Sequence, residues 1–131
     1  MQTLKEELRT FIEDSLPSCP PVFLDYMPEG QERAVQIIEY GAVPPSLPFD
    51  YGIWARRVQI VCKDTGARAA EDMAYALYEF LNSGLTEEER LIELSDGRKI
   101  IARPRELPFF MSREGHSSLY GFNLVVHTNR R

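Results

Sequence analysis

The sequence of 131 residues predicts one small α+β domain, residues 1–131, in which two main helices pack on one face of an antiparallel or mixed β-sheet. Two observations carry this prediction. Residues 56–84 change from a period-two to a 3.6-residue apolar pattern, which is typical of a strand that leads into a helix. Residues 91–103 place two β-like runs around Asp96 and Gly97, and an Asp-Gly pair in that position indicates a β-hairpin.

The strand and helix of residues 56–84 are expected to form the centre of the domain. Val58, Ile60 and Cys62 alternate with polar side chains, so one face of the strand should be buried. The helix that follows carries a single apolar stripe at three- and four-residue spacing, formed by Ala70, Met73, Ala74, Leu77, Tyr78 and Leu81. Because both apolar surfaces need cover, the strand and the helix should share one core.

Local capping residues indicate where the two helices begin. Asp64 or Thr65 is expected to cap the central helix, because each has a side-chain oxygen that can accept from a free N–H group. A second amphipathic helix is predicted over residues 3–16, where Thr3 and Glu6 match the T-x-x-E capping box.

The remaining elements are short strands joined by segments rich in proline and glycine. The strands are expected at residues 22–26, 34–40, 91–94, 99–103 and 118–128. Proline fixes its own backbone and lacks an N–H donor, so irregular connectors are predicted at residues 18–21, 41–52 and 104–117.

Composition and charge exclude several classes of protein. Hydrophobic residues make up 44% and charged residues 27%, which argues against disorder, and no apolar run approaches the about 20 residues of a membrane span. The charged start of the sequence lacks the apolar segment of a signal peptide, so a cytoplasmic location is expected, and the two dissimilar cysteines favour reduced thiols. The net charge of −5 is concentrated in residues 1–50, which hold nine acidic and three basic side chains. This acidity argues against tight sequence-independent DNA binding.

The sequence contains no pattern that assigns catalysis, so no catalytic, cofactor-binding or metal-binding residue is predicted. His116 and His127 lack metal-ligand spacing, and structural or solvent-exposed roles are expected for both. Gly66 lies between a strand and a helix, but its surroundings lack the glycines and lysine of a phosphate-binding loop.

Two apolar segments without regular periodicity are the more informative feature. One contains Leu47 and Phe49, and the other contains Leu107, Phe109, Phe110 and Met111. Such side chains either pack back over the sheet or meet a partner, since aromatic residues and methionine are enriched at protein interfaces. The sequence leaves both possibilities open.

An ordered set of motifs resembles a known family. The segments CPPVFLDYMPEGQERAVQIIEYGAVPP (residues 19–45) and YGIWARRVQIVCKDTGARAAEDMAYALYEFLN (residues 51–82) are similar to the bacteriophage minor capsid and tail-terminator proteins that join head and tail. The likeness consists of an N-terminal amphipathic helix, a P-E-x-x-x-x-A turn, a Y-G-A-x-P-P loop, an R-x-V-Q-I strand and an alanine-rich helix. It covers most of the chain.

The resemblance implies a structural protein and no enzyme. Members of the family form hexameric rings on the last ring of the tail tube, stop its polymerisation and contact the head connector protein. DNA passes through the lumen without specific binding, and no cofactor is implied. The expected location is the host cytoplasm during assembly and then the head–tail junction of the virion. The hairpin at Asp96 and Gly97 and the segment of residues 104–117 would be candidates to reach a neighbouring subunit or the tail tube.

The sequence is also compatible with two alternatives. A connector or adaptor on the head side is expected to look much like a terminator in sequence, because both are small, acidic and ring-forming. A small cytoplasmic enzyme or ligand-binding domain is the other alternative. It requires a pocket that gathers His116, His127 and an acid within hydrogen-bonding distance.

Overall fold

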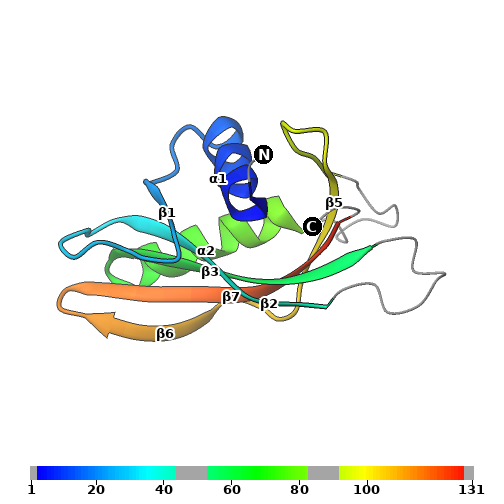
Figure 1. The fold of residues 1–131 in the computed structure, drawn as a ribbon. Coiled ribbons are helices and arrows are strands. Elements are labelled where there is room, and N and C mark those ends of the chain that lie inside the picture. The colour runs from blue at the N-terminus through cyan, green and yellow to red at the C-terminus, as the bar shows by residue number, and fades with distance from the viewer. Residues whose placement is uncertain (1–2, 44–52, 83–91, 129–131) are drawn as a thin grey trace.

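A computed structural model describes residues 3–43, 53–82 and 92–128, which form a mixed β-sheet with two helices on one face (Figure 1). The predicted α+β class is therefore confirmed. The elements follow the order α1 (Leu4–Ser15), β1 (Val22–Leu24), β2 (Ala34–Val43), β3 (Trp54–Thr65), α2 (Ala67–Leu81), β4 (Ile92–Glu93), β5 (Lys99–Pro104), β6 (Phe109–Glu114) and β7 (Ser117–Thr128).

The sheet is built on one long antiparallel pair. Strands β3 and β7 pair along their whole length, from Trp54 with Thr128 to Thr65 with Ser117. The strand order is β1-β2-β3-β7-β5-β4, and β6 pairs with β7 beside this series. Strands β1 and β2 are parallel, and the other pairs are antiparallel. The sheet is therefore mixed.

The core lies between the sheet and the two helices. Strand β3 contributes Val58, Ile60 and Cys62 to this core, each fully buried, as their alternation predicts. Helix α2 packs against β3 and β7, and α1 packs against β1 and β2. The apolar stripe of α2 faces the same layer, where Tyr78 meets Phe122 edge-on at 5.8 Å between ring centroids. No helix among the residues that the structure describes is long and apolar enough to cross a membrane.

The two helix starts turn out differently. Thr3 caps α1 as predicted, since its hydroxyl accepts from the N–H of Glu6 at 3.2 Å. The prediction that Asp64 or Thr65 caps α2 is wrong, because the cap residue is Gly66 and no side chain caps it. Gly66 has φ near +90°, a conformation open to glycine, and this turn carries the chain from β3 directly into the helix. The Asp64 carboxylate instead accepts from the N–H of Thr65.

The segment of residues 104–117, predicted as an irregular connector, contains a strand. Residues 109–114 form β6, which pairs antiparallel with the first half of β7. Two features explain why hydrophobic periodicity does not predict this strand. A bulge at Met111 shifts the register, and most β6 side chains are exposed on both faces, so no apolar alternation develops.

The two cysteines differ in reactivity as well as position. Both are free thiols; Cys62 lies in the core and Cys19 is half-buried. Burial raises the pKa of the Cys62 thiol strongly, whereas burial and the nearby Glu13 raise the pKa of Cys19 less. We expect iodoacetamide to modify Cys19 at least about tenfold faster than Cys62 in the native protein, because the thiolate is the reacting form. Mass spectrometry of timed samples measures both rates, and equal rates would contradict the described core.

Candidate functional site

Exposed apolar side chains gather on and just before β6. The exposed fractions are 58% for Leu107, 38% for Phe109 and 53% for Phe110. Strand β6 pairs only with β7 among the described strands, so its other edge faces outward. An exposed strand edge with apolar side chains is a natural place for contact with another chain.

The aromatic groups of β6 are supported from one side. Phe110 lies opposite Tyr120 in the register, and their rings meet edge-on at 5.6 Å between centroids. A hydrogen bond links the Tyr120 side chain to Glu71 on α2, and burial followed by this bond raises the pKa of Tyr120. One side of Phe110 is thus held against the domain, and the rest of its ring is available to a partner.

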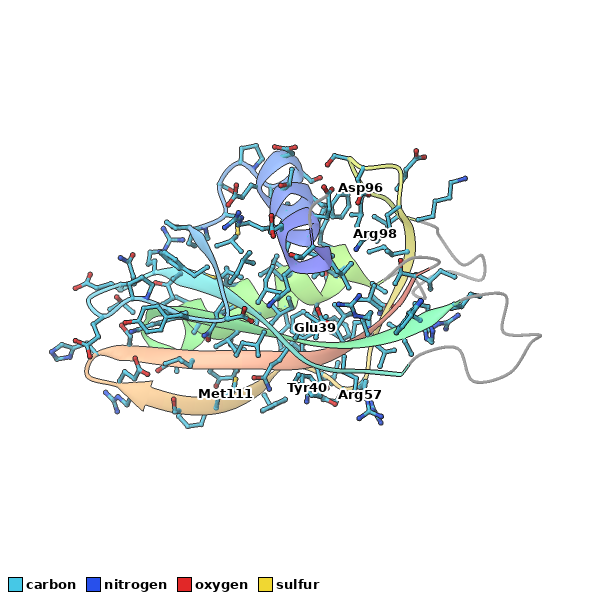
Figure 2. The ribbon with its side chains drawn as sticks, viewed as in Figure 1. Glu39, Tyr40, Arg57, Asp96, Arg98 and Met111 are labelled. Atoms are coloured by element: carbon cyan, nitrogen blue, oxygen red, sulfur yellow. The ribbon has the colours of Figure 1, made fainter. Side chains whose placement is uncertain are left out.

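Gly121 of β7 lies very close to the backbone of β3 and to the Met111 side chain of β6. Gly121 of β7 lies opposite Phe109, and a Cβ added to Gly121 would lie 2.6 Å from the Ile60 carbonyl oxygen and 2.6 Å from the Met111 sulfur. Only glycine fits between these groups. Figure 2 shows Met111 on the side of the sheet that faces away from the helices.

The predicted hairpin is present, but it lies on another part of the molecule. The Gly97 N–H donates to the Leu94 carbonyl at 2.9 Å, and Gly97 has φ near +84°. The Ser95 hydroxyl donates to the carboxylate of Glu7 on α1 at 2.6 Å. The tip is therefore fixed to α1, and Figure 2 shows Asp96 beside this helix, far from Met111.

The predicted interface residues thus do not form one surface. Leu107, Phe109, Phe110 and Met111 belong to the β6 region, and Asp96 and Gly97 belong to the hairpin over α1. Leu47 and Phe49 lie outside the described residues. Their roles as contacts stay predictions.

The backbone of Gly97 allows a direct test of the hairpin. We expect Gly97→Val to lower the free energy of unfolding by about 1–2 kcal/mol, because a β-branched residue is strained at positive φ. Gly97→Asn is the matched control and should cost less, since asparagine tolerates this conformation. Urea unfolding measures both variants. Equal stability of the two would show that Gly97 does not hold the positive φ.

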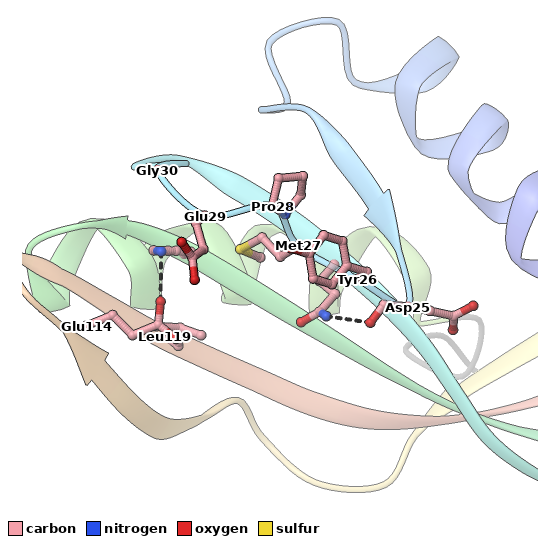
Figure 3. Close-up of a pocket in the computed structure, with 10 residues that line it drawn as sticks. Asp25, Tyr26, Met27, Pro28, Glu29, Gly30, Glu114 and Leu119 are labelled. Carbon is pink, nitrogen blue, oxygen red and sulfur yellow. Dashed lines mark hydrogen bonds and ion pairs between the residues drawn. The ribbon is translucent and has the colours of Figure 1, made fainter.

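A pocket of about 530 Å³ lies at one end of the sheet (Figure 3). Residues 25–30, which connect β1 to β2, form one side of it, and Glu114 and Leu119 form part of the other. The Lys63 ammonium binds the Glu114 carboxylate at 2.8 Å and so joins β3 to β6. No sequence signal indicates this pocket, because it depends on the parallel pairing that brings residues 25–30 back across the strands.

The structure separates the groups that the enzyme alternative requires. His116 lies in the turn before β7 and His127 lies near the end of β7, so roughly 35 Å of extended strand lies between them. Burial and the neighbouring Arg103 lower the pKa of His127, which favours its uncharged form. No group of three or more potential metal ligands occurs within residues 3–43, 53–82 and 92–128.

The structure is thus a small α+β domain with an exposed strand edge that carries apolar side chains. A comparison with protein-family models identifies the family directly. Residues 5–109, from α1 to the first residue of β6, match the family described as bacteriophage tail terminator protein, and the chain belongs to this family. The resemblance seen in the sequence is therefore confirmed. A comparison with curated proteins found no match.

Proposed function

We propose that this protein forms a ring at the head-proximal end of the phage tail, where it ends polymerisation of the tail tube and joins the tail to the head. The family match over residues 5–109 is the observation that carries this proposal. The proposed partners are further copies of the chain, the tail tube protein and the head connector protein. The proposed location is the head–tail junction of the virion, reached from the host cytoplasm.

The β6 region supplies the contact surface that such a role requires. A protein that caps a polymer must bind its last ring strongly and offer no site for the next one. The outward edge of β6 offers backbone groups, and Phe109, Phe110 and Leu107 offer apolar area beside it. We assign this region to contact with the tail tube or with a neighbouring subunit.

Net acidity supports the passage of DNA through a ring without retention. The chain carries a formal charge of −5, so a lumen lined by it would release few counterions from DNA and bind DNA weakly. DNA is accordingly a passing partner in this proposal, with no specific site. No cofactor or catalytic step enters the proposed function.

Antibody-labelled electron microscopy tests the proposed location. Antibodies against this protein are expected to bind purified free tails at the single end that joins the head. Label at the head vertex of tail-less particles, with none on free tails, would instead favour a head-side connector. Label along the whole tube would contradict both roles.

A further inference from the structure

The sheet face that points away from the helices carries a row of two arginines. Arg57 of β3 and Arg103 of β5 both lie opposite Val125 of β7, on its two sides. Residues directly opposite in antiparallel strands point to the same face, so the row runs Arg57, Val125, Arg103 across three strands. Both arginines are exposed.

A bulge in β2 extends this row with an aromatic group. The register shifts between Glu39 and Gly41, so Tyr40 is the additional residue, and 49% of it is exposed. Figure 2 shows Tyr40 next to Arg57 on the side away from the helices. Arg56, the preceding residue, is different: its side chain is only 12% exposed and forms an ion pair with Glu39. Arg56 is therefore structural, whereas Arg57 faces outward.

The row has the composition of a protein interface. Arginine and tyrosine are enriched among the residues that dominate binding energy, and Val125 lies half-buried between them. These positive groups belong to a chain whose formal net charge is −5, so acidic side chains are in excess elsewhere in the sequence.

The last turn of α1 presents acidic side chains. Glu13 and Asp14 are exposed in its last turn, and that turn contains no basic residue. Carboxylates are unfavourable at a helix C-terminus, because the helix dipole places partial negative charge there. A cationic partner at this end would remove that repulsion.

We propose that the row of Arg57, Val125 and Arg103, with Tyr40, docks on the acidic end of α1 of a second copy of this chain. The contact is heterologous, because the sheet face of one copy meets the helix layer of the next. A repeated heterologous contact produces a ring when its rotation closes. This inference rests on the proposed function, since it identifies the surfaces that form the ring.

Charge reversal on each surface tests the pairing. The sheet variant is Arg57→Glu/Arg103→Glu, and the helix variant is Glu13→Arg/Asp14→Arg. Each alone brings like charges together and should weaken self-association at least about tenfold. A mixture of the two restores opposite charges at every contact in an alternating assembly. Sedimentation velocity at low salt and high protein concentration measures association of each variant and of the mixture.

Matched controls separate this pairing from a change in net charge. Arg68→Glu changes an arginine that is 92% exposed on α2, and it alters the net charge as much as Arg57→Glu alone. Arg68→Glu should associate like the original protein. Circular dichroism checks that every variant is folded.

Weak self-association of each variant alone, with recovery in the mixture, would support docking of the arginine row on the acidic end of α1. A monomeric original protein at every salt concentration, variants that associate normally, or a mixture that stays dissociated would overturn it. None of these results alters where the protein lies on the tail or whether it sets tail length, so the proposed function is judged separately.

Discussion

Replacement of Phe109 and Phe110 by serine is expected to abolish control of tail length while the chain stays folded. The two rings are 38% and 53% exposed, so their removal takes little from the core. Loss of the contact between Phe110 and Tyr120 should lower the free energy of unfolding by about 1 kcal/mol. The loss of apolar area at a partner surface should be far more damaging, since a few aromatic residues dominate binding energy.

The measurement is complementation of a phage that lacks this gene. Cells that supply the double variant should yield tubes of irregular length, whereas the original gene restores uniform tails. Tyr26→Ser is the matched control, because it removes an aromatic side chain that is 69% exposed and lies in the connection between β1 and β2, outside β6. Uniform tails from the double variant would refute the role of β6, and an unfolded double variant would show that these rings belong to the core.

Addition of one methyl group at Gly121 is expected to destabilise the protein by about 2–3 kcal/mol, the range of a tight overpacking change. The new Cβ of Gly121→Ala would lie 2.6 Å from the carbonyl oxygen of Ile60 and from the sulfur of Met111. The methionine side chain can rotate away, but the carbonyl belongs to the backbone of β3, paired on both sides. Relief therefore requires the central strands to move apart.

Gly41→Ala is the matched control for this change. Its Cβ would lie 3.7 Å from Cδ of Arg57, which is ordinary contact, so its effect should stay within about 0.5 kcal/mol. Urea unfolding compares the two variants, and the midpoint should fall by about 1 M for Gly121→Ala alone. Equal midpoints would mean that β3, β6 and β7 are not as closely packed as described.

The parts of the fold that could be predicted from sequence are those with regular local periodicity. The alternation around Ile60 and the apolar stripe of α2 each predict one buried face. Gly97 indicates a turn that needs positive φ. Strand β6 was missed because the bulge at Met111 and the exposure of both its faces remove any period. The Asp64 and Thr65 caps were wrong because Gly66 alone satisfies the turn.

The candidate surfaces were only partly predictable, because they depend on the pairing of distant strands. The sequence alone indicated that Phe109 and Phe110 are large apolar residues in a segment without regular periodicity. The row of Arg57 and Arg103 was not predicted, since it exists only because β3 and β5 both pair with β7. The pocket beside Glu114 likewise arises from the parallel pairing of β1 and β2.

The tail-length distribution of particles from the phage with this gene deleted tests the central claim most directly. Electron microscopy should show filled heads without tails beside free tubes of widely varying length, because nothing ends their polymerisation. Filled heads beside separate tails of one fixed length would contradict a terminator and assign the protein to the head side. Intact, infectious particles would contradict any role in joining head and tail.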